Sequence, residues 1–189
     1  MNDEKIRMMR DEKIPKVLLK MGLPTMIGML VGALYNVVDA YFVGGLGTSQ
    51  MGAVSVAFPI GQVLIGLGLT FGSGAASYVS RLLGENRTEE ASQTASTSLL
   101  SSLAVGIVVI AVTLCFMDRI LVALGATETI LPYARAYAMI YVSGAILNIF
   151  NVTMNNIVTG EGAAKLTMTA MLVGGGLNAV LDPIFIYSL

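Results

Sequence analysis

The chain has 189 residues, of which 55% are hydrophobic and 12% charged, and its formal net charge is −1. Soluble domains carry about 25% charged residues, so this composition, with a mean hydropathy of +0.77, indicates a protein that crosses a membrane several times. The near-neutral charge gives no sign of a nucleic-acid partner, and a chain without histidine and with one cysteine, Cys115, does not suggest a zinc, haem or disulfide site.

The N-terminal segment, residues 1–16, contains the string Asp-Glu-Lys-Ile twice and is rich in basic residues. Two interpretations stay open for it: a cytoplasmic amphipathic helix that lies in the membrane interface, or a solvated leader. A cleaved signal peptide is rejected, because the apolar run that follows is of spanning length and lacks a small-x-small cleavage site.

Five stretches are long and apolar enough to cross the hydrocarbon core, which takes about 20 residues for each helix. The sequence therefore predicts an all-α polytopic membrane protein, since a β-barrel would need short segments of alternating polarity instead. Short loops connect the expected spans, which are residues 17–44, 51–80, 95–116, 130–158 and 166–189.

The basic residues indicate an orientation. All 11 Lys and Arg residues except Arg119 and Arg135 fall within residues 1–20 or in the second and fourth loops, which lie on one side of a five-span protein. By the positive-inside rule this side is cytoplasmic. We therefore expect a multi-pass protein of the plasma (inner) membrane with a cytoplasmic N-terminus.

Two acidic residues inside otherwise apolar spans, Asp39 and Asp182, are the best candidates for function. Each follows an asparagine by about one helical turn, Asn36 and Asn178 respectively. A carboxylate in hydrocarbon costs roughly 2.5 to 3.5 kcal/mol on insertion scales, so chance seldom leaves two there with matching amides. At about 1.5 Å per residue both acids lie in the outer half of the membrane, so they can share one layer.

The spacing of these pairs has a chemical sense. Positions three or four apart share a helix face, so each amide can support its carboxylate or offer an oxygen to a cation. A buried carboxylate can bind Na⁺ among oxygen ligands, or it can carry a proton because desolvation favours the neutral form. The alternative is a polar clamp between helices that carries nothing. Two matched pairs in one layer favour the functional interpretation.

Other polar positions give weaker signals. Gln62 is a lone amide in the second span and is typical of a packing bond. In the fourth span, polar side chains at three- and four-residue spacing form one stripe that would line a cavity or bond to a neighbouring helix: Tyr137, Asn148, Asn151 and Asn155. Pro24 and Pro183 each remove a backbone hydrogen bond and allow their helices to bend.

Seven short motifs, in order along nearly the whole chain, resemble a known family. They are VDAYFVGGLG (38–47), GAVS (52–55), SRLLG (80–84), LGA (124–126), YARAY (133–137), GEG (160–162) and LNAVLDP (177–183). The series is similar to the N-terminal part of a multidrug and toxic compound extrusion (MATE) transporter.

This resemblance implies a fold of twelve helices in two six-helix lobes, with residues 17–189 as most of the N-terminal lobe. The chain would then be a fragment, because the sixth helix and the C-terminal lobe are missing from it. The implied function is antiport with Na⁺ or H⁺ that exports amphipathic, often cationic compounds, without another cofactor. The implied partners are membrane lipid, these small molecules and the missing C-terminal lobe.

Residue by residue, Asp39, Asn178 and Asp182 match the cation-binding acids and amide of the family's N-terminal lobe. Pro24 matches the proline at which the first helix bends, and Tyr137 fits the same network. Two alternatives stay open: a lipid-linked sugar flippase of the same superfamily, and a non-transporting membrane assembly subunit. An enzyme is not expected, because the sequence offers no metal cluster and no pair of nucleophile and base.

Overall fold

The structure, a computed structural model, describes residues 12–45 and 47–188, and within these residues every regular element is an α-helix. The all-α prediction is therefore confirmed for the described part of the chain. The helices are α2 (Ile14–Gly44), α3 (Thr48–Gly84), α4 (Thr88–Cys115), the short α5 (Met117–Ala123), α6 (Leu131–Gly160) and α7 (Ala164–Ser188). All except α5 are long and apolar enough to cross a membrane.

The helices extend beyond the apolar stretches that the sequence marks as spans. The loop expected over residues 81–94 shrinks to a turn at residues 85–87, because α3 continues to Gly84 and α4 already begins at Thr88. Hydropathy marks where hydrocarbon can be, whereas a helix continues into polar sequence as long as nothing breaks it. Helix α5, in the expected loop of residues 117–129, was not predicted. The interfacial helix considered for residues 1–16 lies mostly outside the described residues.

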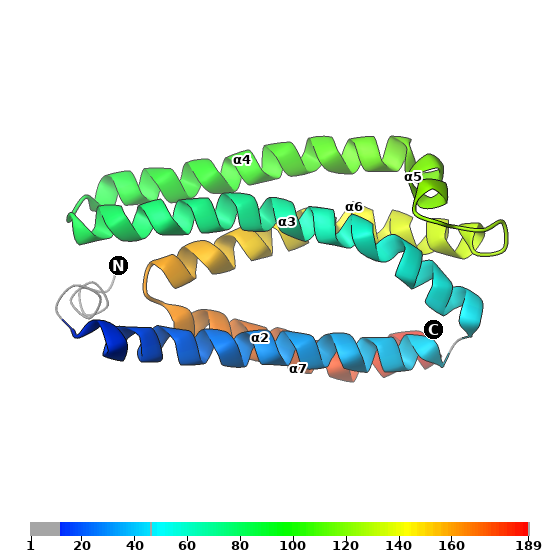
Figure 1. The fold of residues 1–189 in the computed structure, drawn as a ribbon, viewed down its shortest axis with the longest axis horizontal. Helices are drawn as coiled ribbons and strands as arrows, with labels where there is room; N and C mark the ends of the chain where they lie inside the picture. Colours follow the sequence, from blue (N-terminus) through cyan, green and yellow to red (C-terminus); the bar gives the residue numbers. More distant parts are fainter. Residues whose placement is uncertain (1–11, 46, 189) are drawn as a thin grey trace.

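The core of the molecule is the contact between α3 and α6, which α4 covers on one side (Figure 1). Small residues on both helices allow their backbones to approach closely, as is common in membrane helix pairs. A Cβ atom added to Gly160 would lie 2.8 Å from the Cα atom and from the carbonyl oxygen of Ala76. In the same contact the hydroxyl of Thr153, which is fully buried, donates to the carbonyl oxygen of Gly68 across 3.2 Å.

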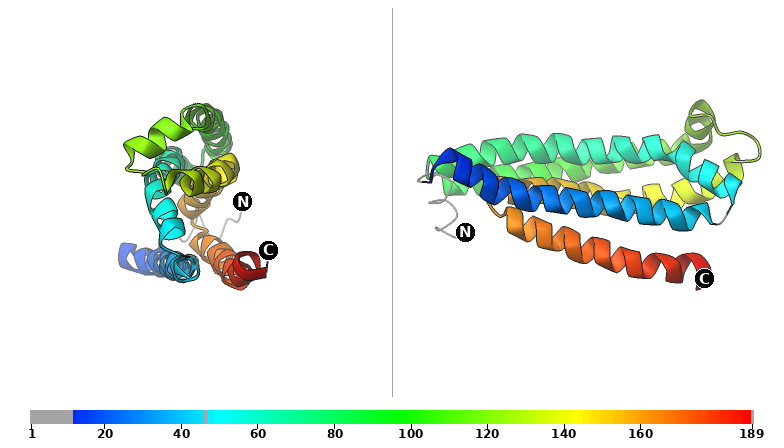
Figure 2. Two further views of the ribbon diagram at one scale, coloured as in Figure 1. Left: turned by 90° about the vertical axis from the view of Figure 1, so that its right-hand side faces the viewer. Right: turned by 60° about the horizontal axis from the view of Figure 1, so that its bottom comes forward.

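Helices α2 and α7 form a second unit, because they pack mainly on each other (Figure 2). Here too glycine permits the contact. A Cβ atom added to Gly175 of α7 would lie 3.1 Å from Cγ1 of Val31 on α2, and one added to Gly28 would meet the side chain of Met171. The two helices that carry the acid–amide pairs are therefore neighbours in space, although they are the first and last helices described.

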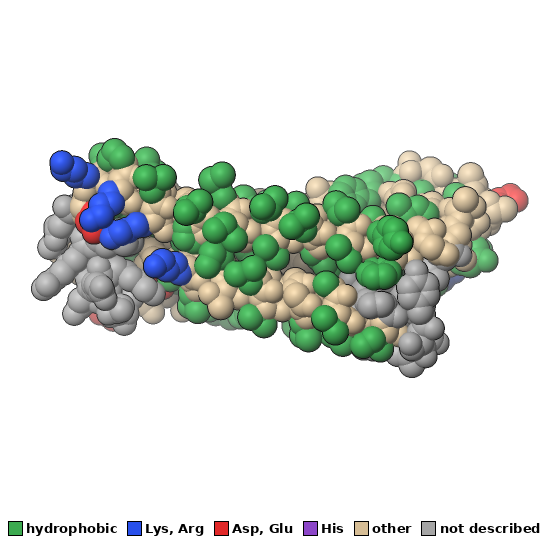
Figure 3. Space-filling model, turned by 90° about the horizontal axis from the view of Figure 1, so that it is seen from below, with side chains coloured by type: hydrophobic (Ala, Val, Ile, Leu, Met, Phe, Trp, Pro, Cys, Tyr) green, Lys and Arg blue, Asp and Glu red, His purple; other side chains and the backbone are tan. Residues whose placement is uncertain are grey.

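The long helices alternate in direction, so the start of α2, the α3–α4 turn and the α6–α7 turn meet at one end (Figure 1). Hydrophobic side chains cover the face of the α2–α7 pair that points away from the other helices, along most of the length of the pair (Figure 3). Lys and Arg side chains gather at the end where α2 begins (Figure 3). Leu18, Leu19 and Met26 are examples of these exposed apolar residues. Such a large apolar surface is stable against lipid and not against water.

The close contact of α3 and α6 gives a first prediction. Gly160→Ala should lower the free energy of unfolding by about 1–3 kcal/mol, because the new methyl group overlaps backbone that cannot move aside. Gly66→Ala is the matched control, since a Cβ atom there has nothing within 4 Å and alanine favours a helix by up to about 1 kcal/mol. Thermal unfolding of the purified variants in detergent measures both. Equal shifts in Tm would contradict the proposed contact.

Candidate functional site

The first acid–amide pair lies in the C-terminal half of α2. Asp39 is half-buried, whereas Asn36 is exposed, and the Asn36 amide nitrogen donates to the carbonyl oxygen of Gly32 across 2.8 Å. One N–H of this amide therefore serves its own helix. The second N–H and the side-chain oxygen remain for other partners, and the oxygen can be a ligand for a cation.

Asp39 also connects α2 to α6. Its carboxylate lies close enough to Tyr137 to interact electrostatically with the phenol. The ring of Tyr137 stacks in turn on Tyr141, with 5.9 Å between the centroids and 12° between the planes. The structure thus brings together Asp39 and Tyr137, two of the residues that the sequence singled out.

The second pair lies on α7. Asn178 is exposed, and Asp182 follows it by one helical turn. Asp182 and Pro183 both belong to the helix, but their side chains lie outside the described part of the structure. Pro24 is buried in α2, and the helix continues through it without interruption.

Two cavities follow one another below the acids, between the α2–α7 pair and the α3–α6 pair. The upper one, of about 220 Å³, is lined by Tyr35, Asn151, Asn155 and Asn178 together with small residues. Asp39 and Asp182 each lie one helical turn beyond a lining residue, namely Tyr35 and Asn178. Asp39 and the backbone of Asp182 therefore lie beyond the end of this cavity that is farther from the basic residues.

The lower cavity, of about 340 Å³, continues toward the end where the basic residues gather, and it shares Asn155 and Met171 with the upper one. Its polar lining comes from all four helices and consists of Thr25, Ser73, Ser77, Ser80, Asn155, Asn156, Thr159 and Thr167. None of the residues that line either cavity is charged. These hydroxyls and Tyr35 were not expected from the sequence. The spacing of Ser73, Ser77 and Ser80, which puts them on one face of α3, could have indicated the cavity wall.

Three of these hydroxyl groups donate their proton to the backbone of their own helix. Thr25 donates to Met21, Ser73 to Leu69 and Thr159 to Asn155, in each case to a carbonyl oxygen one turn back. A hydroxyl whose proton is used in this way retains its oxygen lone pairs for other partners. The cavity wall is therefore neutral in charge but rich in acceptors, which suits a cationic or proton-donating molecule.

Two members of the polar stripe of α6, Asn151 and Asn155, line these cavities, whereas Tyr137 and Asn148 line neither. Asn155 donates to the side-chain oxygen of Asn151 across 2.7 Å and to its backbone oxygen across 2.9 Å. The side-chain oxygen of Asn148 is buried and accepts no hydrogen bond from the described residues, so it is an acceptor in need of a donor. Gln62 is exposed on α3 and lines neither cavity.

Five helices of spanning length, four of which line the polar cavities, define a multi-pass helical membrane protein. The MatE family profile matches residues 24–184. The chain belongs to the MatE family, and the resemblance to the N-terminal portion of a MATE transporter is confirmed.

Curated relatives agree with this assignment. The chain is 35% identical over 188 residues to the multidrug export protein MepA of Staphylococcus aureus (strain MSSA476), covering 99% of this chain and 42% of the relative. It is 34% identical over 190 residues to MepA of Staphylococcus haemolyticus (strain JCSC1435), covering 100% and 42%. The chain therefore spans less than half the length of these relatives.

A solved structure supports the fold. A multidrug resistance MATE family transporter of the MOP superfamily, in an outward-facing conformation, superposes with a TM-score of 0.92 at 36% sequence identity. The match covers 98% of this chain and 41% of that transporter.

The upper cavity gives a second prediction. In a Cys115→Ala background, Asn178→Cys should react with a small water-soluble thiosulfonate at least tenfold faster than Val180→Cys. The reactive species is the thiolate, which forms only where water reaches. Asn178 lines the cavity, whereas Val180 is exposed on about the opposite side of α7, where lipid is expected. Mass spectrometry of labelled protein in liposomes gives both rates, and equal rates would argue against a hydrated cavity.

Proposed function

We propose that this chain is the N-terminal lobe, in large part, of an exporter that moves amphipathic, often cationic compounds out of the cell in exchange for Na⁺ or H⁺. The observation that carries the proposal is an uncharged polar cavity between the helices, beyond which Asp39 and Asp182 follow one helical turn further along α2 and α7. The names of the curated relatives, which are multidrug export proteins, support the same function.

The chemistry of the site supports coupling through the two carboxylates. Each costs several kcal/mol in hydrocarbon unless a cation, a proton or a hydrogen-bond donor compensates its charge. Tyr137 can donate to Asp39, and the oxygens of Asn36 and Asn178 add neutral ligands for a cation. Among the described residues, none that lines the cavities is charged, so in this proposal Asp39 and Asp182 supply the negative charge that attracts a cationic compound.

Antiport follows if the compound and the coupling ion compete for these carboxylates. Binding of Na⁺ or H⁺ neutralises the acids and lowers the affinity for a cationic compound, and the compound lowers the affinity for the ion by the same factor. An ion that enters from outside then displaces the compound. The acceptor-rich wall of hydroxyls and amides gives weak, orientation-tolerant contacts, which suit compounds of varied shape.

In this proposal the remaining parts of the exporter, a sixth helix of this lobe and a second lobe, are partners of the chain. The start of α2 and the α3–α4 and α6–α7 turns face the cytoplasm of a cell with this protein in its plasma membrane, because most basic residues gather at that end. The multi-pass character itself follows from the five spanning helices.

Two alternatives remain as outcomes of the tests. A flippase for a lipid-linked sugar phosphate would be favoured by a cationic cavity, but no Lys or Arg lines either cavity. An assembly subunit without transport activity would need no ion-binding acids. The variants below separate these possibilities from an exporter.

The coupling prediction concerns an efflux-competent transporter that contains this chain. Asp39→Asn and Asp182→Asn should each reduce gradient-driven efflux at least tenfold while the protein still inserts, because asparagine keeps the shape and loses the charge. Asn178→Ala should reduce it only a few-fold, since it removes a dipole. Initial efflux rates in proteoliposomes under an imposed Na⁺ or H⁺ gradient measure this.

A structural clamp makes a different prediction for the same variants. Asparagine can still hydrogen-bond between helices, so a clamp would show its loss in yield or in Tm and not in the response to the gradient. Normal gradient-driven efflux by the Asp39→Asn, Asp182→Asn double variant would refute the proposed coupling. Neutral compounds exported as well as cationic ones would refute the role of the carboxylates in substrate binding.

The orientation is tested separately by labelling intact cells. In a Cys115→Ala background, an impermeant thiol reagent should label Thr48→Cys, at the α2–α3 turn, and should not label Lys165→Cys until the cells are opened. The reason is the concentration of basic residues at the Lys165 end, which the positive-inside rule places in the cytoplasm. Labelling of position 165 alone in intact cells would reverse the topology.

A further inference from the structure

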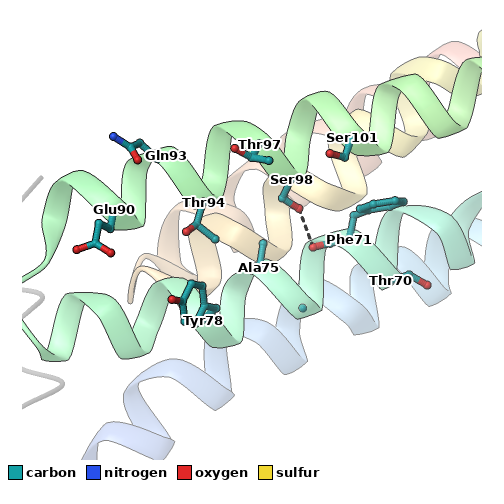
Figure 4. A pocket seen from close by; sticks show the side chains of 11 residues that line it. Thr70, Phe71, Ala75, Tyr78, Glu90, Gln93, Thr94, Thr97, Ser98 and Ser101 are labelled. Atoms are coloured by element: carbon teal, nitrogen blue, oxygen red, sulfur yellow. Dashed lines mark hydrogen bonds between the residues drawn. The ribbon is translucent and has the colours of Figure 1, made fainter.

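A groove with polar walls, of about 580 Å³, lies between α3 and α4 near the end where the basic residues gather (Figure 4). This groove is distinct from the two cavities below the acids, because it lies on another face of α3. Thr70, Gly74 and Tyr78 line the groove, whereas Ser73, Ser77 and Ser80 line the lower cavity. Successive members of each set are three or four residues apart, so each set is one helix face. The proposed export site does not use this groove.

The groove presents hydroxyl and amide groups at one edge of the helix pair. Glu90, Gln93, Thr94, Thr97, Ser98 and Ser101 of α4 line it at three- and four-residue spacing, and Figure 4 shows them along one side of that helix. The hydroxyl of Ser98 donates to the carbonyl oxygen of Phe71 across 2.9 Å and ties the helices together. Thr97 is exposed and has no such structural bond among those described.

Ion pairs mark the cytoplasmic mouth of the groove. Arg87 binds Glu90 through both its Nε atom, at 2.7 Å, and a terminal nitrogen, and it also contacts Glu85 across 3.1 Å. Hydrogen bonds from Arg87 and then Arg81 lower the pKa of the Glu85 carboxyl below its ordinary value. The mouth therefore carries both signs of charge side by side.

Apolar residues continue the groove toward the membrane centre. On α4 the face that carries Thr97 and Ser101 goes on through Val105, Val108 and Val112, and on α3 Val63 continues the face of Thr70. All four valines are substantially exposed. From Glu90 to Ser101 the polar part is about 16 Å long at 1.5 Å per residue. The surface thus changes from ionised through hydroxyl-lined to apolar, as a membrane leaflet does.

We propose that this groove binds one zwitterionic phospholipid of the cytoplasmic leaflet, with an ethanolamine-type headgroup at the ionised mouth. The ammonium group lies against Glu90, the charged residue that lines the groove. Gln93, Thr94 and Thr97 donate to the phosphate and ester oxygens, and an acyl chain follows the exposed valines. Along the groove, the charged, hydroxyl-lined and apolar parts follow in the same order as the headgroup, ester region and acyl chain of a phospholipid.

The charges favour a zwitterionic lipid over an anionic one. No Lys or Arg lines the groove itself, and the guanidinium of Arg87 is already held by two carboxylates. Glu90 and Arg87 hold each other in the same way. A headgroup without net charge leaves this ion-paired mouth balanced, whereas an anionic headgroup would add a negative charge that no cation lining the groove compensates.

Removal of the hydroxyls tests the site in the intact protein. Thr97→Val with Ser101→Ala keeps the shape and should weaken retention of dioleoylphosphatidylethanolamine at least fivefold, measured by native mass spectrometry of the detergent-purified protein during lipid titration. The matched control is Thr169→Val with Ser143→Ala, two exposed hydroxyls that donate to their own helices; it should retain the lipid as the unaltered protein does. Equal retention by both double variants would overturn the proposal.

The headgroup preference has its own test. The unaltered protein should retain dioleoylphosphatidylethanolamine in preference to dioleoylphosphatidylglycerol, and Glu90→Gln should abolish or reverse this preference, because it removes the carboxylate and frees Arg87 for a phosphate. Equal retention of both lipids by the unaltered protein, or an unchanged preference in Glu90→Gln, would refute the assignment. These measurements need no transport, so they stand or fall independently of the proposed export function.

Discussion

The close approach of α3 and α6 is the contact on which the remaining architecture depends. Where Gly160 meets Ala76 and Thr153 meets Gly68, the two backbones are nearer than ordinary side chains permit. In hydrocarbon there is no hydrophobic drive to hold helices together, so such contacts and buried hydrogen bonds carry the association. They fix the asparagines of α6 and the serines of α3 in one wall.

The α2–α7 pair packs beside this wall as a separate unit, and it carries both intramembrane acids. Its contacts with the other helices are few compared with those inside the pair. A unit of this kind can shift without disturbing the α3–α6 contact, and a shift would change the distance from Asp39 to Tyr137. A displacement of the pair would therefore change the surroundings of Asp39, and the proposed coupling would use such a change.

Helix α3 serves two polar spaces on different faces. One is the cavity below the acids, and the other is the groove that it forms with α4. Small side chains make both possible, since serine, threonine, alanine and glycine leave room between helices where leucine would fill it. Many of these small side chains are serine or threonine, so the ends of α3 and α4 near the basic residues are polar. These ends are nevertheless helical.

The sequence alone determined the all-α, five-span character and the family, because apolar length and ordered motifs are local properties of the chain. It also singled out Asp39 and Asp182, since a charge in hydrocarbon is costly wherever the helix packs. The extra helix α5 and the early start of α4 escaped it, because hydropathy does not report helix ends.

Only the tertiary structure decided that α2 pairs with α7, that Tyr137 lies near Asp39, and that Tyr35 and the serines of α3 complete the cavity. The physical reason is that spanning helices are apolar on every side, so periodicity does not tell which face packs and which faces lipid. That choice depends on contacts between small residues far apart in the chain, such as Gly160 and Ala76, whose meeting no single segment reveals.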